Sequence, residues 1–312
     1  MASIQKLGIL VVYFIDENEE LILDLHLDMI KQNTHVNYTI YAAVNRLSPR
    51  LRLKLEQRSD LIICSIPTTD IRLSKEHAYY LETLADIAVS DNVSHLCTLD
   101  VDSFPIKPGW AEDLASSLTN ESPVAAILRE ENGDSVLTHP SCTFFERSFW
   151  VTYKPQIYPS WKECKCFACL FFYIRNISEL DTGIGISYIL QQNGLSWRNL
   201  TRSNMINEHT VMGGVYSDII FHLGAGSRSI KLCRKDVQNV HLSTIDKLKL
   251  KISRFIPYKP LQSFVSARTL EKRDKLLVPV IEANQLSYNK IRSALLTNPN
   301  NYISYLSGAI DE

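Results

Sequence analysis

The sequence predicts an α/β fold in which helices flank a mainly parallel central sheet, followed by a mostly helical C-terminal appendage. Over the first hundred residues, short apolar runs alternate with longer amphipathic stretches, which is the pattern of strand, helix and strand. One helical stretch separates each apolar run from the next, and such a crossover favours parallel pairing. Beyond residue 228, apolar and basic residues alternate until helical periods resume at 267–277 and 287–296.

The first three strands are predicted from their apolar runs. Residues 7–15 form an almost uninterrupted apolar run, which indicates a buried strand, and residues 38–44 and 61–66 are the next two. Between the first two strands, residues 17–33 carry apolar side chains at helical spacing. The pair Ser48-Pro49 begins the following helix, because Ser caps helices and Pro suits an early helical position.

A further helix and strand complete this part of the chain. Residues 74–89 predict a helix with Ser74 as its cap, and residues 95–99 predict the fourth strand. In such sheets, ligands bind beyond the carboxyl ends of the strands. Asp16 and Asn45 follow two of these ends, where they are suited to base or ribose contacts. The chain has no G-x-G-x-x-G and no P-loop motif, which disfavours a dinucleotide-binding or P-loop protein.

Two carboxylates stand at the end of the fourth strand. Asp100 and Asp102 are two residues apart, so in an extended chain their side chains point the same way. Like charges on one side of a chain repel unless a cation lies near them, and a hard divalent ion such as Mg²⁺ or Mn²⁺ suits oxygen ligands. The alternative is that both aspartates only end the strand and form a turn.

Composition disfavours some classes of protein. The 312 residues carry 33 Lys+Arg against 34 Asp+Glu, so a net charge of -1 disfavours a nucleic-acid partner. No apolar run approaches the roughly 20 residues of a membrane-spanning helix, and the start of the chain lacks a secretory pattern. Seven cysteines, an odd number, indicate reduced thiols. We therefore expect a soluble, cytoplasmic protein.

From these motifs the chain resembles the glycosyltransferases of the GT-A fold, in which a D-x-D sequence follows a central strand. The segments that carry the resemblance span residues 7 to about 228 and are Leu99-Asp100-Val101-Asp102-Ser103-Phe104-Pro105 with Gly109-Trp110, then Ser74-Lys75-Glu76-His77-Ala78, Asp181-Thr182-Gly183, and Phe221-His222-Leu223-Gly224-Ala225-Gly226-Ser227-Arg228. The resemblance implies a Rossmann-like catalytic domain over 1–240, with a nucleotide-binding half at about 1–110 and an acceptor half at about 111–240. Residues 241–312 would be the helical appendage.

The resemblance also implies roles for individual residues. It implies a site for Mn²⁺ or Mg²⁺ at Asp100, Asp102 and His222. It implies contacts with a nucleotide-diphosphate sugar at Asp16, Asn45, His77, Asp100, Ser227 and Arg228. Asp181 is the candidate general base, in a helix that begins near Ile184. Two alternatives stay open: Asp181 as the N-cap of that helix, and His222 as a buried core histidine.

The activity implied is that of a hexosyltransferase-like enzyme that moves a single sugar to an acceptor hydroxyl. The acceptor would be a glycan or glycolipid in surface glycan synthesis. The Q-x-x-R-W sequence of processive synthases is absent, which favours single addition. One alternative is a nucleotidyltransferase, although the N-terminus lacks the glycine-rich basic loop expected of one. Another is a non-catalytic protein that binds nucleotide sugars or glycans.

Two further patterns have competing interpretations. Cys164, Cys166 and Cys169 have a spacing that suits zinc, or they are buried thiols beside an apolar run. Basic and apolar residues over 247–264 suit peripheral contact with anionic lipid at the inner face of the membrane, or a solvated helix face, or a dimer contact.

Overall fold

The computed structural model describes residues 3–133, 137–158, 181–224, 236, 243–253 and 259–309. The chain divides into two compact units, one formed by 1–228 with 291–312 and the other by 229–290. The division at residue 240 that the sequence suggests stays a proposal. Ser227, Arg228 and the three cysteines at 164, 166 and 169 lie outside the described residues.

A seven-stranded sheet forms the centre of the first unit. Its strands are β1 (Leu7–Val12), β2 (Tyr38–Ala43), β3 (Leu61–Ile63), β4 (His95–Leu99), β6 (Val124–Ile127), β7 (His139–Glu146) and β8 (Arg198–Leu200). Their order is β3-β2-β1-β4-β7-β6-β8. The strands from β3 to β4 pair in parallel, which confirms the prediction for the first four. Beyond them β7 runs antiparallel to both β4 and β6, and β8 runs parallel to β6.

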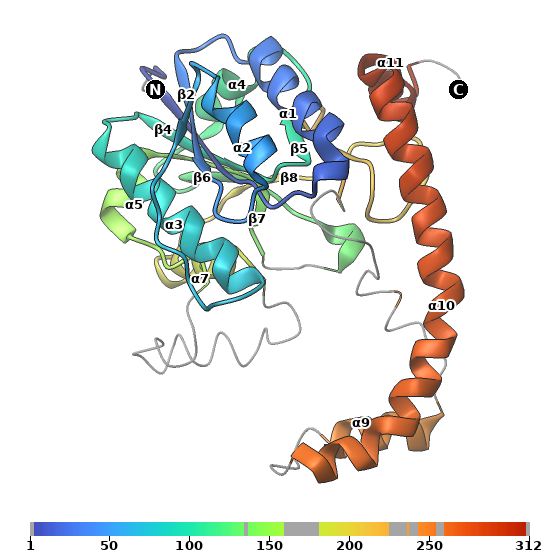
Figure 1. The fold of residues 1–312 in the computed structure, drawn as a ribbon. Coiled ribbons are helices and arrows are strands. Elements are labelled where there is room, and N and C mark those ends of the chain that lie inside the picture. The colour runs from blue at the N-terminus through green and yellow to red at the C-terminus, as the bar shows by residue number, and fades with distance from the viewer. Residues whose placement is uncertain are drawn as a thin grey trace. The chain divides into compact units, whose positions relative to one another are not determined.

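Helices cover both faces of this sheet (Figure 1). On one face, Leu10 and Val12 pack in one hydrophobic cluster with α3 (Ser74–Ser90), α5 (Arg147–Tyr153) and α7 (Ile184–Gln192). Phe145 of β7 belongs to the same cluster, so its neighbour Phe144 points to the opposite face. There Phe144 meets Trp110 of α4 (Trp110–Ser117), whose indole donates to Thr34 at the end of α1 (Glu20–Asn33).

The predicted helix starts have different outcomes. Ser48 caps α2 (Pro49–Glu56) as predicted, because its hydroxyl accepts a hydrogen bond from the amide of Leu51 at 3.4 Å. The prediction that Ser74 caps α3 is wrong, since the cap position is Leu73 and no side chain caps this helix. Leu73 has a φ of 62°, and the hydroxyl of Ser74 donates instead to Asp181. The described residues also form two short 3₁₀ helices, Glu17–Glu19 and Glu130–Asn132.

A second, three-stranded antiparallel sheet brings a late segment beside the end of β4. It consists of β5 (Ser103–Pro105), β10 (Ile220–His222) and β9 (Gly214–Tyr216), in that order. Ser103 stands opposite His222 in the register, and the rings of Phe104 and Phe221 stack 5.2 Å apart. The segment that follows the D-x-D pair is therefore fixed against the strand that carries His222.

Two buried side chains of α1 hold the free edge of β5. The Nδ1 of His26 donates to the carbonyl of Ser103 at 2.8 Å, and the amide of Asn33 donates to the carbonyl of Pro105 at 3.0 Å. Both side chains are almost fully buried. These two side chains donate hydrogen bonds to two backbone carbonyls on the edge of β5. Leaving a buried carbonyl without a donor would cost free energy of folding.

The buried His26 gives stability a predictable pH dependence. Burial lowers the pKa of His26 from about 6.5 to about 4, against the opposing effect of the Ser103 carbonyl. Between these values the unfolded chain binds more protons, so stability is full above pH 6.5 and falls as the pH drops towards 4, by up to about 3 kcal/mol. The measurement is the free energy of unfolding by urea at several pH values. Between pH 4 and 6.5 it should change less with pH in His26→Gln than in the wild type. The matched variant His35→Gln changes an exposed histidine and should keep the pH dependence of the wild-type free energy of unfolding.

The C-terminal part is helical, as predicted. Its helices are α9 (Thr244–Ser253), α10 (Lys259–Thr297) and α11 (Pro299–Leu306). In the second unit, Asp246 of α9 pairs with Lys272 of α10 at 2.9 Å. In the first unit, Arg292 pairs with Glu19 at 2.6 Å, and Tyr302 of α11 donates to Glu208. Among the described residues, no helix has the length and apolar character needed to cross a membrane.

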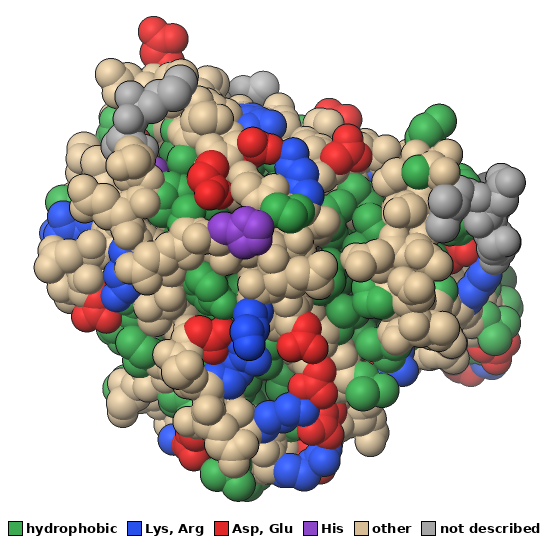
Figure 2. Space-filling model, turned by 90° about the horizontal axis from the view of Figure 1, so that it is seen from above, with side chains coloured by type: hydrophobic (Ala, Val, Ile, Leu, Met, Phe, Trp, Pro, Cys, Tyr) green, Lys and Arg blue, Asp and Glu red, His purple; other side chains and the backbone are tan. Residues whose placement is uncertain are grey.

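Acidic and basic side chains are mixed on the surface of the molecule. Figure 2 shows acidic and basic side chains interspersed on one face of the molecule. Ion pairs of this kind join α1 and α2, where the ammonium of Lys54 lies 2.9 Å from Glu20 and 2.7 Å from Asp24. Such local compensation agrees with the net charge of -1.

Candidate functional site

The D-x-D pair lies at the carboxyl end of β4, near the middle of the large sheet. Asp102 is 3% exposed, and its carboxylate accepts a hydrogen bond from the amide of Gly224 at 3.1 Å. Its backbone carbonyl accepts from the amide of Leu223 at 2.9 Å. Asp102 is thus fastened to the chain that leaves β10, which explains how residues 120 positions apart share one site.

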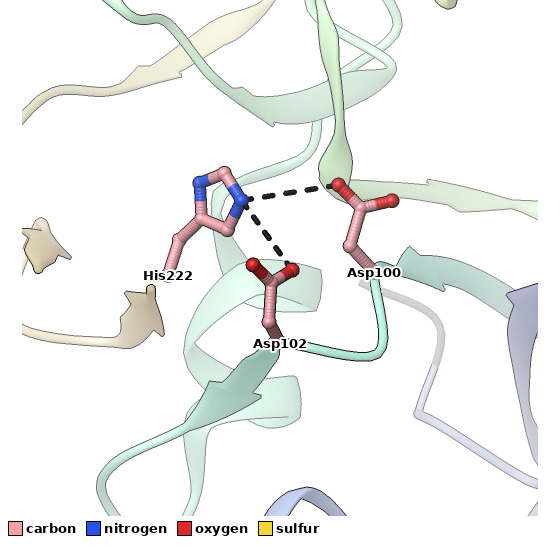
Figure 3. Close-up of side chains that lie close together, drawn as sticks. All are labelled: Asp100, Asp102 and His222. Atoms are coloured by element: carbon pink, nitrogen blue, oxygen red, sulfur yellow. Dashed lines mark ion pairs between the residues drawn. The ribbon is translucent and has the colours of Figure 1, made fainter. Parts of the chain in front are cut away.

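Three potential metal ligands converge at this point (Figure 3). One ligand atom from each of Asp100, Asp102 and His222 lies within 4.8 Å of the others. The Nε2 of His222 lies 3.9 Å from Asp100 and 3.7 Å from Asp102. These separations are too long for direct hydrogen bonds. The three groups therefore face one another without closing a direct contact.

The chemistry of these groups fits a divalent cation. Burial lowers the pKa of His222, so its imidazole is neutral at pH 7 and offers a lone pair. Among the described residues, its buried Nδ1 has no hydrogen-bond partner. Two carboxylates and one imidazole suit Mn²⁺ or Mg²⁺. Without a cation, the buried carboxylate of Asp102 and the partly buried carboxylate of Asp100 would repel each other.

A cavity of about 440 Å³ opens beside this cluster. Its walls come from the ends of β1, β2, β4 and β10 and from the starts of α3, β7 and α7. The residues predicted from the sequence that line it are Asp16, His77, Asp100, Asp102, Asp181 and His222. Asn45 is not among the lining residues, because its amide donates to the carbonyl of Ile66 at 2.8 Å. The structure therefore brings together every predicted site residue that it describes except Asn45.

His77 connects the first turn of α3 to the D-x-D pair. Its Nε2 lies 3.6 Å from the carboxylate of Asp100, and its ring lies beside Phe14. Asp100 is thus flanked by two imidazoles, His77 on one carboxylate oxygen and His222 on the other.

Asp181 joins α7 to the start of α3. One carboxylate oxygen accepts from the hydroxyl of Ser74 at 2.6 Å and from the amide of Thr182 at 2.8 Å. The guanidinium of Arg129 lies 4.0 Å from the other oxygen. The N-cap of α7 is Gly183, so the interpretation of Asp181 as the cap of its own helix is wrong. Its side chain lines the cavity instead and is about one-third exposed.

Three charged residues of the cavity were not predicted from the sequence. Arg46 and Glu76 form an ion pair at 2.6 Å, and Arg129 approaches Asp181. Arg46 directly follows Asn45 at the end of β2, and Glu76 directly precedes His77. Position near a strand end was the signal available for Arg46, but sequence spacing does not show which of two neighbouring side chains enters a cavity.

Comparisons with known proteins give a likeness of structure. No family model matches the chain, and no curated protein matches it in sequence. The structure is similar to the glycosyltransferase GlyE of Streptococcus pneumoniae TIGR4, with a TM-score of 0.40 and 12% identity over 63% of this chain and 45% of that one. It is also similar to the mannosyltransferase PcManGT from Pyrobaculum calidifontis, solved with GDP-Man and Mn²⁺, with a TM-score of 0.41 and 11% identity over 97% of this chain and 73% of that one. Both TM-scores are below 0.5, so what we propose for this chain depends on its own side chains.

Proposed function

We propose that this chain is a metal-dependent glycosyltransferase that moves a single sugar from a nucleotide-diphosphate sugar to an acceptor hydroxyl. The observation that carries the proposal is the group of Asp100, Asp102 and His222 at the carboxyl end of β4, beside a cavity. Asp102 and His222 are buried, and Asp100 is partly buried. This edge of an α/β sheet is where nucleotide ligands bind. The resemblance of the D-x-D, Asp-Thr-Gly and His-containing segments to GT-A enzymes supports the same activity.

In this proposal Asp102, His222 and Asp100 hold the cation and fix its place in the cavity. A divalent ion bound there supplies electrostatic stabilisation of the negative charge that develops on the leaving diphosphate. His77 lines the cavity with its Nε2 3.6 Å from the carboxylate of Asp100, and we propose that it contacts the nucleotide. The burial of Asp102 and His222 keeps water from these groups, which strengthens every charge interaction at the site.

Asp181 is the proposed general base if the anomeric configuration inverts. Its carboxylate would take the proton of the acceptor hydroxyl while the new carbon–oxygen bond forms. The bond from the anomeric carbon to the diphosphate breaks in the same step, and the diphosphate leaves with the electron pair. Ser74 and Thr182 hold one carboxylate oxygen, which leaves the second oxygen, near Arg129, to meet the hydroxyl.

The direct test is an assay for released nucleoside diphosphate, with a panel of sugar nucleotides, a glycan or glycolipid acceptor, and Mn²⁺, Mg²⁺ or EDTA. We expect one nucleotide class to be consumed with Mn²⁺ and an acceptor, and none with EDTA. A nucleotidyltransferase would instead release pyrophosphate from a nucleoside triphosphate and a sugar phosphate. Metal-dependent binding without turnover would indicate a non-catalytic binding protein and contradict the proposed activity.

We expect Asp181→Asn to lower sugar transfer by about 10² to 10⁴, the usual contribution of a general base. Asparagine still accepts a hydrogen bond from Ser74, so the affinity for the nucleotide should stay within about threefold of wild type. Steady-state rates and calorimetric binding measure the two effects separately. The matched variant Asp218→Asn, at a residue outside the cavity lining, should keep both values. An unchanged transfer rate in Asp181→Asn would remove it from the role of base.

The acceptor and its location are also proposals. A glycan or glycolipid of surface glycan synthesis fits the resemblance, and a cytoplasmic enzyme could meet a lipid-linked acceptor at the inner face of the membrane. Residues 247–264 are the proposed contact, and α9 contributes the exposed apolar side chains Leu248 and Ile252 with the exposed Lys249. Apolar residues beside lysines suit the surface of an anionic membrane.

A further inference from the structure

The guanidinium of Arg46 lies at the cavity wall beyond the end of β2. Arg46 lines the cavity, and its guanidinium lies 5.4 Å from the centre of the Phe14 ring. One of its terminal nitrogens lies 2.6 Å from the carboxylate of Glu76, which is 2% exposed. The buried carboxylate of Glu76 and the face of Phe14 both contact the guanidinium and restrict its orientation.

The ion pair changes what Arg46 can recognise. The charge of Glu76 compensates that of Arg46, so the pair as a whole attracts a phosphate less than a lone arginine would. A guanidinium carries five N–H donors and no acceptor, and Glu76 engages one end of it. About 45% of the Arg46 side chain is exposed, so donors remain for a ligand in the cavity. Directed donors without much free charge suit a neutral acceptor such as a carbonyl oxygen.

The position of Arg46 relative to the D-x-D pair suits the base of a nucleotide. The strands β2 and β4 are the two neighbours of β1, so their ends lie about two strand spacings apart, roughly 10 Å. If the diphosphate lies beside Asp100 and Asp102, the nucleoside extends along this edge of the sheet past Asp16 to Arg46. Phe14 adds a flat apolar surface in the same wall.

We propose that Arg46 reads the base of the donor nucleotide, and that the base carries a carbonyl oxygen at the edge it presents. This inference rests on the proposed function and names its donor class as guanine or uracil nucleotides. Guanine presents O6 and N7 as acceptors, and uracil presents O4 in the same way as thymine. Adenine and cytosine present an amino group at the equivalent atom, and a guanidinium has no acceptor for that group.

Two matched pairs of ligands test the inference on the unaltered protein. UDP and CDP differ at position 4 of the base and in the proton on N3. GDP and ADP differ at position 6, in the proton on N1 and in the 2-amino group of guanine. We expect calorimetry with Mn²⁺ to give at least tenfold tighter binding to the carbonyl member of one pair or both. Equal affinities within both pairs, or a preference for the amino members, would overturn the inference and leave the proposed function standing. Failure of all four to bind would overturn both.

The variant Arg46→Met tests whether Arg46 determines the preference for the base. Arg46→Met keeps an apolar stem over Phe14 and removes the donors, so the affinity ratio within the preferred pair should fall to near one while Mn²⁺ binding stays unchanged. Arg50→Met is the matched control, because Arg50 is an exposed arginine of α2 that pairs with Glu20 outside the cavity. Glu76→Gln should lower the ratio partly, since it leaves Arg46 in place without its charged partner. A ratio that persists in Arg46→Met would assign base selection to another residue.

Discussion

Asp102→Asn is expected to lower the affinity for Mn²⁺ by at least about 100-fold and to abolish metal-dependent nucleotide binding. Changing residues that merely support metal ligands already costs 10- to 100-fold, and Asp102 is a proposed ligand itself. The substitution removes the negative charge of Asp102, a residue that is 3% exposed and whose carboxylate lies 3.7 Å from the Nε2 of His222. Asparagine has almost the same shape and still accepts the amide of Gly224, so the local fold should survive.

The measurement is the melting temperature with Mn²⁺ or EDTA, together with calorimetric titration of Mn²⁺. A cation that binds only the folded chain raises the melting temperature by mass action. We expect this rise in the wild type and in Asp113→Asn, which changes an exposed aspartate of α4 paired with Lys107. We expect none in Asp102→Asn, whose melting temperature in EDTA should equal or exceed that of the wild type because repulsion from Asp100 is relieved. A full Mn²⁺ response in Asp102→Asn would contradict the metal site.

The sequence was sufficient for the parts of the fold that depend on local pattern. The runs that form β1 to β4 are apolar and separated by helical stretches, so the existence of these strands and their parallel pairing follow from short-range periodicity and the crossover rule. Their order in the sheet was not predicted. The antiparallel insertion of β7 between β4 and β6 depends on contacts among distant segments, and no local period encodes it. The same holds for β10, whose pairing with β5 brings His222 to the D-x-D pair.

For the site, the sequence predicted where along the chain the residues lie, but not which side chains point into the cavity. Strand ends predicted the neighbourhood of Asp16, Asp100 and Asp102, which all line the cavity. At the end of β2 the prediction chose Asn45, whereas its neighbour Arg46 lines the cavity and Asn45 bonds to the backbone. Asn45 and Arg46 lie in a turn after β2, where the direction of each side chain depends on the backbone angles of the turn. Sequence spacing does not give these angles.

We expect Gly183→Ala to lower the free energy of unfolding by at least about 3 kcal/mol. Gly183 has a φ of 104°, and a Cβ there would lie 1.9 Å from the carbonyl oxygen of Thr138. The left-handed region alone costs an L-residue roughly 1–2 kcal/mol, and the backbone contact must be relieved in addition. Thr138 is buried and its hydroxyl donates to the carbonyl of Gly183, so neither segment has free space to move. The cost therefore falls on the junction of α7 and β7, two residues after Asp181.

Gly194→Ala separates the effect of backbone conformation from that of the contact. Gly194 also has a positive φ, 66°, but a Cβ there meets nothing within 4 Å. Its substitution should cost only the conformational part, roughly 1–2 kcal/mol. Urea unfolding of the two variants beside the wild type gives the difference, which measures the backbone contact between Gly183 and Thr138. Equal losses in both variants would show that the chain relieves this contact without cost. A larger loss in Gly183→Ala, with weaker nucleotide binding, would show that the contact also fixes the cavity wall that carries Asp181.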